Sequence, residues 1–209
     1  MPRPPTLRTI EVFASLQGEG LRQGEPSIFV RLAGCNLRCS FCDTKYAWRS
    51  GREEAVDDLL LKIARLWRAL PAGWVVLTGG EPLAQDVAPL VRGVRRLGLR
   101  VQVETNGTFE PRPPANWYTL SPKPPLFSFR PGFVKKAREV KLVVSRELTF
   151  ETVARMRRRF PPRVPILLQP QSGLRWSMKK TASFAFRACY EGLDNVRVSL
   201  QQHKALGLR

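Results

Sequence analysis

Short apolar runs recur along this chain and alternate with amphipathic segments. Runs rich in β-branched and aromatic side chains predict strands over residues 8–13, 27–32, 74–77, 100–104, 116–120, 139–144, 166–168 and 196–200. Apolar residues at helical spacing predict helices over residues 53–70, 86–97, 150–160 and 179–189. Residues 111–133 are proline-rich and, outside the strand at 116–120, irregular. Strands therefore alternate with helices along most of the chain.

This alternation predicts an α/β fold with a largely parallel sheet. A complete eightfold βα barrel needs about 250 residues, and the chain has 209. We therefore expect a shortened, open βα barrel of about six mainly parallel strands, with residues 1–209 forming one domain. Trp67 and Phe160 are expected in the core, and Cys189 is expected to be a small buried apolar residue.

The chain is strongly basic, with 35 Lys and Arg against 17 Asp and Glu and a net charge of +18. Such a balance favours contact with nucleic acid, but the basic residues are scattered. Arg155, Arg158 and Arg159 share a predicted helix face, which is more typical of a solvated surface. Only nonspecific nucleic-acid binding is predicted. No apolar run reaches about 18 residues and residues 1–5 lack the apolar core of a signal peptide, so we expect a cytoplasmic protein without a membrane partner.

Three of the four cysteines fall in a C-x3-C-x2-C pattern, at Cys35, Cys39 and Cys42. Three thiolates on one loop can each hold one iron of a [4Fe–4S] cluster and leave the fourth iron open to a ligand from solution. A tetrahedral zinc site would need a fourth ligand, and Cys189 and His203 lie far along the chain. The pattern therefore favours a cluster, with zinc as the alternative.

Polar and glycine-rich segments follow the predicted strands. They come after Leu32, Leu77, Val103, Leu120 and Leu168. Catalytic groups of βα folds gather at the carboxyl ends of strands, so this recurrence predicts an active site. The Gly-Gly turn within residues 78–82 also allows a ligand to approach the backbone without meeting a Cβ atom.

These motifs, in this order, resemble the 7-carboxy-7-deazaguanine synthase family over nearly the whole chain. The matching segments are Glu11 to Gly20, Phe29 to Cys39, Cys42 to Trp48, Thr78 to Pro82, Val103 to Thr108, Ser121 to Lys123 and Gln201 to Lys204. The Leu-Gln-Gly-Glu-Gly and Cys-Asp-Thr segments are specific to this family. The cysteine and glycine motifs are shared with the wider radical SAM superfamily.

The resemblance implies a reaction of deazapurine (queuosine) biosynthesis, in which 6-carboxy-5,6,7,8-tetrahydropterin becomes 7-carboxy-7-deazaguanine with loss of ammonia. It implies a [4Fe–4S] cluster, S-adenosylmethionine (SAM) and Mg²⁺ as cofactors, and a 5′-deoxyadenosyl radical that removes the hydrogen at C6 of the pterin. It also implies an electron donor such as a flavodoxin or ferredoxin, and a homodimer.

Site residues follow by the same resemblance. Cys35, Cys39 and Cys42 would hold the cluster and Thr44 would hold Mg²⁺. The SAM pocket would comprise Phe41, Cys42, Asp43, Gly80, Ser121, Pro122, Lys123, Gln169, Pro170, Gln171 and Ser172. The pterin would contact Leu16, Gln17, Gly18, Arg31, Thr78 and the terminal carboxylate of Arg209. Arg31 suits the 6-carboxylate because a guanidinium pairs with it through two hydrogen bonds. His203, Glu104 and Asn106 receive no role.

Two other functions remain open on the residues alone. A glycyl-radical activating enzyme has the same cysteine spacing, but it acts on a protein and does not require the segments around Leu16 and Thr44. A basic, metal-containing nucleic-acid-binding protein would account for the charge. Metal content separates the second alternative, because about four irons per chain indicate the enzyme and one zinc indicates the binding protein.

Overall fold

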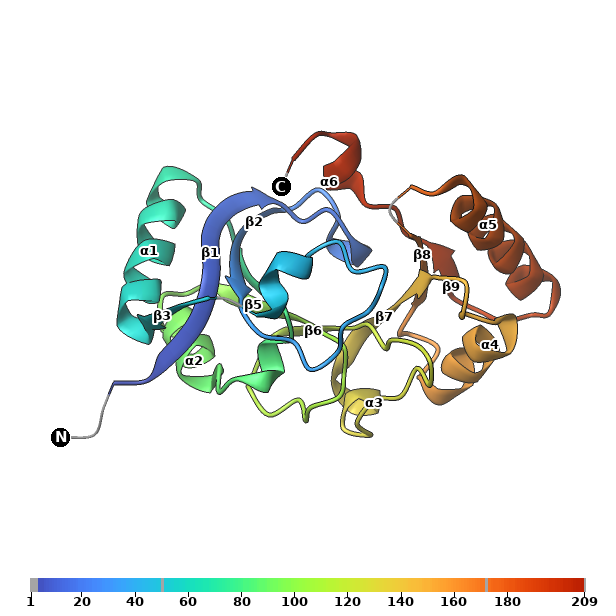
Figure 1. The fold of residues 1–209 in the computed structure, drawn as a ribbon, viewed down its shortest axis with the longest axis horizontal. Coiled ribbons are helices and arrows are strands. Elements are labelled where there is room, and N and C mark those ends of the chain that lie inside the picture. The colour runs from blue at the N-terminus through green and yellow to red at the C-terminus, as the bar shows by residue number, and fades with distance from the viewer. Residues whose placement is uncertain (1–3, 50, 172, 209) are drawn as a thin grey trace.

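The computed structural model describes residues 4–49, 51–171 and 173–208. These residues form one sheet in the order β3-β1-β2-β4-β5-β6-β7-β8-β9 (Figure 1). The strands are β1 (Thr6–Leu16), β2 (Pro26–Leu32), β3 (Arg52–Ala55), β4 (Trp74–Gly79), β5 (Arg100–Thr105), β6 (Trp117–Leu120), β7 (Ala137–Val144), β8 (Ile166–Pro170) and β9 (Val196–Val198). The helices are α1 (Val56–Ala69), α2 (Ala88–Arg96), α3 (Phe133–Lys136), α4 (Phe150–Arg159), α5 (Arg175–Tyr190) and α6 (Gln202–Ala205).

The predicted α/β fold with a mostly parallel, open sheet is confirmed. Every neighbouring pair from β2 to β9 is parallel, and β1 pairs antiparallel with β2 and with β3. The prediction of about six strands is wrong, because the sheet of the described residues has nine. Part of the difference is β3, which the sequence analysis assigned to the start of a helix.

Strand β3 is held by its neighbour β1 through backbone pairing and through its two glutamates, Glu53 and Glu54, which accept hydrogen bonds from the hydroxyls of Thr6 and Thr9. Its four residues, Arg52 to Ala55, pair antiparallel with Thr6 to Thr9 at the edge of the sheet. The segment has no apolar alternation, and its two glutamates read naturally as the first turn of the helix that follows. Helix α1 begins only at Val56.

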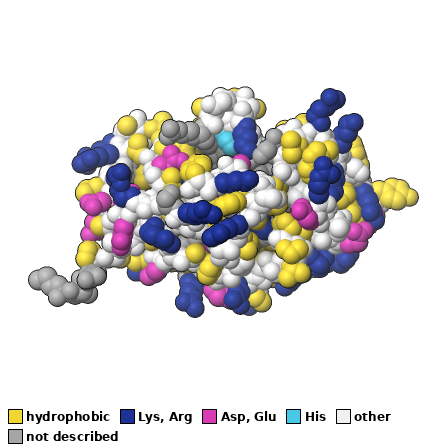
Figure 2. Space-filling view, viewed as in Figure 1, with side chains coloured by type: hydrophobic (Ala, Val, Ile, Leu, Met, Phe, Trp, Pro, Cys, Tyr) yellow, Lys and Arg dark blue, Asp and Glu magenta, His cyan; other side chains and the backbone are white. Residues whose placement is uncertain are grey.

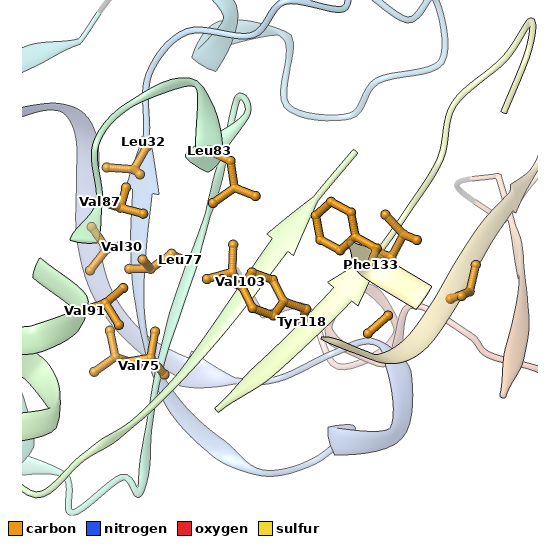
Figure 3. Close-up of a cluster of buried hydrophobic side chains, with 14 of the residues drawn as sticks. Val30, Leu32, Val75, Leu77, Leu83, Val87, Val91, Val103, Tyr118 and Phe133 are labelled. Carbon is orange, nitrogen blue, oxygen red and sulfur yellow. The ribbon is translucent and has the colours of Figure 1, made fainter. Parts of the chain in front are cut away.

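The core lies between the central strands and the helices that cover them. Val30, Leu77 and Val103, from three adjacent strands, have no solvent exposure and lie in one apolar cluster (Figure 3). Helices α1 and α2 lie toward one end of the sheet, and α4 and α5 toward the other (Figure 1). None of the described helices is both long and apolar enough to cross a membrane.

Of the three predicted core side chains, the structure confirms one. Phe160 is 4% exposed, as expected, but Trp67 is 38% exposed in the last turn of α1. Cys189 is also exposed. Its neighbour Ala188 occupies the buried face of α5, and one residue turns the side chain by about 100° around a helix. Cys189 therefore points away from the core.

Candidate active site

A cavity of about 710 Å³ opens at the carboxyl ends of the parallel strands. Its lining includes residues at or just after the ends of β2, β4, β5, β6, β7 and β8. The cysteine loop after β2, the turn between β1 and β2, and the segment around α6 complete the wall. Strand ends that are far apart in the sequence thus form one site, as the recurring polar segments predict.

The cysteine loop directs its thiols inward. Cys35, Cys39 and Cys42 are half-buried and all line the cavity. A turn in which the Cys42 N–H donates to the Cys39 carbonyl (3.1 Å) closes the loop. The Thr44 backbone N–H donates to the Cys42 sulfur at 3.4 Å. The three sulfurs therefore share one cavity with the strand ends.

The donor set fits a cluster better than a single ion. Among the described residues, no three Cys, His, Asp or Glu side chains are gathered so that they could hold one metal ion. Zinc would require such a gathering, with sulfurs about 2.3 Å from a common centre, whereas the corner thiolates of a [4Fe–4S] cluster each bind a different iron. Burial raises the pKa of the Cys35 and Cys39 thiols, and coordination to iron would deprotonate them.

The Gly-Gly turn after β4 packs directly beneath the cysteine loop. The Gly80 N–H donates to the Leu32 carbonyl (2.9 Å) and the Glu81 N–H to the Gly34 carbonyl (2.8 Å). A Cβ atom on Gly80 would lie 2.0 Å from that Gly34 oxygen, and Gly79 has a φ of +114°. Only glycines allow this approach, so the turn fixes the cysteine loop against the sheet as well as lining the cavity.

Glu81 joins the ends of β4 and β5 below that turn. Its carboxylate is 1% exposed and accepts hydrogen bonds from the Leu83 N–H (3.0 Å), the Thr105 hydroxyl (2.7 Å) and the Asn106 N–H (2.7 Å). Burial raises the pKa of this carboxyl group. Asn106 in turn donates from its side chain to Asn36 in the cysteine loop, at 3.1 Å. Glu81 thus supports the site without lining the cavity.

Arg31 is fixed on the wall formed by β1 and β2. Its Nε donates to Glu11 Oε1 at 2.8 Å, and its guanidinium lies 5.5 Å from the ring centre of Phe13 and 5.8 Å from that of Tyr46. The side chain is 15% exposed. The sequence predicts a site role for Arg31 but not for the groups that hold it.

A buried charge network forms another part of the wall. Lys141 is 6% exposed and donates to Glu104 Oε2 at 3.0 Å and to Glu19 Oε2. Gln17 donates to Glu104 (3.3 Å) and Gln201 donates to Glu19 (2.7 Å). Burial alone would lower the pKa of Lys141, but the charges of Glu104 and Glu19 raise it well above its usual range. Lys141 is therefore a cation at any working pH.

Sequence reasoning missed Lys141. The available signal was a lysine inside the apolar run of a predicted strand of a parallel sheet, where both faces are usually buried. A charged side chain at such a position normally has a partner. The sequence does not identify that partner.

The segment around α6 connects the β1–β2 turn to the cysteine loop. The Gln202 N–H donates to the Gly18 carbonyl at 2.8 Å. Lys204 pairs with Asp43 Oδ2 at 2.8 Å, and Gln201 donates to the same oxygen at 3.1 Å. Partial burial would raise the pKa of Asp43, but the hydrogen bond and charge of Lys204 hold it well below its usual range. Asp43 is therefore ionised and held by this segment.

The structure brings most of the predicted site residues together. Besides the three cysteines, those lining the cavity are Leu16, Gln17, Gly18, Arg31, Phe41, Asp43, Thr44, Thr78, Gly80, Ser121, Lys123, Gln169, Pro170 and Gln171. Pro122 is not among the lining residues, and Ser172 and Arg209 lie outside the described residues. The residues left without a role, Glu104, Asn106 and His203, do line the cavity. Lining residues that the analysis did not select include Glu11, Phe13, Glu19, Tyr46, Lys141 and Gln201.

The chain is similar to proteins of known sequence and structure. Residues 29–114 match the radical SAM superfamily. A 7-carboxy-7-deazaguanine synthase of Hyperthermus butylicus is 57% identical over 105 residues, which are 48% of this chain and 43% of that protein. One of Synechocystis sp. is 35% identical over 201 residues, which cover 95% of this chain and 92% of that protein.

The fold agrees with the sequence match. The crystal structure of QueE from Escherichia coli superimposes with a TM-score of 0.79 at 30% identity, covering 95% of each chain. Radical SAM enzymes use a [4Fe–4S] cluster and SAM, and the three loop cysteines lie together in the lining of the cavity. The chain belongs to the 7-carboxy-7-deazaguanine synthase family and is a radical SAM lyase.

Proposed function

We propose that this protein converts 6-carboxy-5,6,7,8-tetrahydropterin to 7-carboxy-7-deazaguanine with loss of ammonia. The observation that carries the proposal is the joint lining of one cavity by the three loop cysteines and by Arg31 with the residues that hold it. A cavity of about 710 Å³ is in the range of about 300–1,000 Å³ that ligand sites usually occupy. A glycyl-radical activating enzyme would instead have to admit a protein backbone, and the family match gives that alternative no support.

The cysteine side of the cavity is assigned to the cofactors. Cys35, Cys39 and Cys42 would hold the cluster, and Phe41, Asp43, Gly80, Ser121, Lys123 and residues 169–171 would surround SAM. When bound, these cofactors would supply a 5′-deoxyadenosyl radical able to remove the C6 hydrogen of the pterin. The residues of this chain position both reactants and keep water from the radical.

Two polar groups on this side are already oriented. Lys123 donates to the Ser121 hydroxyl at 2.6 Å, and burial together with the nearby charge of Lys141 lowers the pKa of Lys123. Thr44 donates its hydroxyl to Asp43 Oδ1 at 3.1 Å. We assign the Thr44 oxygen to Mg²⁺, a hard cation that accepts neutral oxygen ligands when substrate oxygens complete its shell.

Arg31 is the proposed anchor of the pterin carboxylate. Its Nε–H donates a hydrogen bond to Glu11, and the rings of Phe13 and Tyr46 lie near its guanidinium. A guanidinium held in this way loses little conformational entropy when it binds a carboxylate. Leu16 to Gly18 and Thr78 would contact the ring system. The homodimer implied by the resemblance stays part of this proposal.

The test is a direct assay for the product. Anaerobically reconstituted protein, incubated with SAM, dithionite and 6-carboxytetrahydropterin, should yield 7-carboxy-7-deazaguanine by mass spectrometry. Protein without dithionite is the negative control. Absence of product from protein that holds about four irons per chain and binds SAM would contradict the proposed reaction.

A further inference from the structure

We propose that Thr119 and Glu139 are positioning residues that hold the β1–β2 turn (residues 17–25) in the shape that binds the pterin. Neither residue is among those that line the cavity, so both act through the groups that they hold. The inference rests on the proposed function for the identity of the ligand. It adds the buried residues that set the form of one wall of the pterin pocket.

A layer of buried polar side chains lies on three neighbouring strands, on the face of the sheet that carries the cavity. Gln102 on β5, Thr119 on β6 and Glu139 on β7 have no solvent exposure, and we call these three residues the polar layer. Side chains alternate between the two faces of a strand, so Glu104 and Lys141, two positions further along β5 and β7, share this face and line the cavity. Adjacent positions on the three strands belong to the apolar core: Val103, Leu120 and Val140.

The carboxyl group in this layer occupies a position that disfavours its ionised form. The charged side chains visible in Figure 2 lie at the surface of the molecule, where water solvates them. Glu139 has no such exposure, and burial together with the nearby charge of Glu104 raises its pKa. A buried polar group of this kind costs free energy unless hydrogen bonds compensate it, and when they do, it fixes the groups around it in one arrangement. The partners of Glu139 therefore indicate what it fixes.

One oxygen of Glu139 begins a series of hydrogen bonds that ends in the cavity. The Thr119 hydroxyl donates to Glu139 Oε1 at 2.6 Å. The Gln102 side-chain amide donates to the Thr119 hydroxyl at 2.9 Å and to Glu104 Oε1 at 2.7 Å. Thr119 thus accepts one hydrogen bond and donates another, so the orientation of Glu104 depends on the polar layer.

The other oxygen of Glu139 holds the β1–β2 turn. The Leu21 backbone N–H donates to Glu139 Oε2 at 2.7 Å. Gly20 has a φ of +74°, and a Cβ atom at this position would lie 2.4 Å from Glu139 Oε1. Glycine permits both this conformation and this close approach. The turn therefore lies directly against the buried carboxyl group.

Arg22 attaches the turn to the polar layer at a second point. Its side chain is buried, and its guanidinium lies 3.7 Å from the ring centre of Trp74. It donates to the Gln102 side-chain oxygen, and Gln102 also donates to Thr119. The turn is thus attached to β5 through Arg22 and to β7 through Leu21, and Thr119 connects the two attachments.

The cavity end of the turn returns to Glu104. The Gln17 N–H donates to the Glu25 carbonyl at 2.9 Å, and the Gly24 N–H donates to the Gln17 carbonyl at 2.8 Å, so the two ends of the turn are joined. The Gln17 side chain donates to Glu104 at 3.3 Å. The polar layer, the turn and Glu104 therefore form a closed set of hydrogen bonds. The members of this set that line the cavity are Gln17, Gly18, Glu19 and Glu104.

This arrangement prepares one wall of the pocket before the pterin binds. Residues 16–18 are the proposed contacts of the pterin ring system, and a segment that is already ordered loses less conformational entropy on binding. Without the Thr119 hydroxyl, an N–H of Gln102 and an oxygen of Glu139 would be buried without their partner. Both groups would have to move, and the turn and Glu104 are attached to them. The loop cysteines are not members of this set, so the cluster should be unaffected.

The experiment compares two neighbouring residues on opposite faces of β6. Thr119→Val keeps the shape of the side chain and removes the hydroxyl, whereas Thr119→Ser keeps the hydroxyl. The control is Tyr118→Phe, which removes the buried hydrogen bond from the Tyr118 hydroxyl to the Pro113 carbonyl. Binding of 6-carboxytetrahydropterin to each anaerobically reconstituted protein is measured by isothermal titration calorimetry, with SAM present and dithionite absent. SAM binding and iron content are measured on the same samples.

We expect Thr119→Val to raise the Kd for the pterin by about tenfold, the effect of one hydrogen bond to a charged group. SAM binding and iron content should stay as in the wild type. Thr119→Ser should restore most of the affinity, and Tyr118→Phe should bind the pterin as the wild type does. An unchanged Kd in Thr119→Val, or an equal rise in Tyr118→Phe, would overturn the proposal.

Amide hydrogen exchange of the ligand-free proteins tests the positioning directly. Residues 18–24 should exchange faster in Thr119→Val than in Tyr118→Phe, because local opening of the turn becomes easier. Equal exchange of these residues in the two variants would overturn the proposal. If Thr119→Val does not fold, Gly20→Ala makes the same test from the side of the turn, since its Cβ atom would meet Glu139.

The same samples separate this inference from the proposed reaction. Wild-type protein that binds the pterin but forms no product with SAM and dithionite would contradict the proposed reaction alone, because the binding comparison still decides the role of Thr119. Wild-type protein that does not bind the pterin would contradict both. Product formation by the wild type, with equal pterin binding in Thr119→Val, would overturn the positioning role alone.

Discussion

Replacing Lys141 by methionine should cost more stability than any exposed ion pair of this protein. Methionine keeps most of the length of the side chain and removes the charge, so two carboxylates lose their common cation. Breaking a buried pair in this way costs about 3–5 kcal/mol, because a buried charge is left uncompensated. Glu19 and Glu104 keep 18% and 16% exposure, and glutamine amides also donate to them. The lower end, about 3 kcal/mol, is therefore expected.

The same chain offers a matched control. Lys62 pairs with Glu54 at the edge of the sheet, but its side chain is 44% exposed. Exposed pairs of this kind contribute about 0–1 kcal/mol, so Lys62→Met should have little effect. The assay is urea unfolding of the reconstituted proteins, followed by circular dichroism under anaerobic conditions. A loss of about 3 kcal/mol corresponds to a midpoint lower by at least about 1 M urea.

The loss of stability in Lys141→Met should depend on pH in a predictable direction. In the wild type, burial would raise the pKa of Glu19, but the charge and hydrogen bond of Lys141 lower it overall. A carboxyl whose folded pKa is lowered contributes stability above its ordinary pKa of about 4.3, and that contribution is lost as the pH falls through the folded pKa. In Lys141→Met the lowering by the lysine is gone, so burial and the nearby charge of Asp43, which both raise the pKa of Glu19, are opposed only by the hydrogen bond from Gln201. Glu19 therefore ionises less readily in the variant.

The variant should therefore be most destabilised at pH values where Glu19 is forced to ionise. The difference from wild type should be larger at pH 8 than at pH 5. The double variant Lys141→Met/Glu104→Gln should recover part of the loss, because one of the two unpaired charges is gone. Equal midpoints for Lys141→Met and Lys62→Met at pH 8 would refute this account of the network.

Three further predictions concern the residues assigned to cofactors and substrate. Alanine at any one of the three loop cysteines should abolish activity and most bound iron, whereas Cys189→Ala, on the exposed face of α5, should spare both; iron analysis would contradict this if all four behaved alike. Thr44→Ala should keep the cluster and SAM binding but lose turnover or its Mg²⁺ dependence, and an unchanged Mg²⁺ titration would remove Thr44 from the site. Arg31→Lys should weaken pterin binding by about 1.5–3 kcal/mol, seen as a rise in KM of about tenfold to a hundredfold; wild-type kinetics would restrict Arg31 to a structural role.

The placement of the site could be read from the sequence because it depends on a regular rule. Parallel strands end on one edge, so the polar segments after Leu32, Leu77, Val103, Leu120 and Leu168 had to meet there. The cysteine spacing added the chemistry. These two patterns need no knowledge of how individual side chains pair.

The sequence-based predictions were wrong or incomplete where the structure depends on contacts between distant segments, or on which face of a helix a residue occupies. Strand β3 forms by antiparallel pairing with β1. Its charged sequence does not predict this pairing. Cys189 and Ala188 are neighbours in an amphipathic helix, yet only Ala188 is buried. The partners of Lys141 lie 122 and 37 residues away along the chain. No local pattern encodes such contacts, because they depend on which strands the fold makes adjacent.

Acidic side chains balance the charge of the cavity in an otherwise strongly basic chain. Within the described lining of the cavity, four acidic side chains meet four Lys and Arg side chains: Glu11, Glu19, Asp43 and Glu104, with Arg31, Lys123, Lys141 and Lys204. Each of these acids has a basic partner from this set. The cavity is therefore nearly balanced, and the net charge of +18 belongs to the outer surface. Recognition inside the cavity would therefore depend on fixed pairs such as Arg31 with Glu11 rather than on the net charge of the chain.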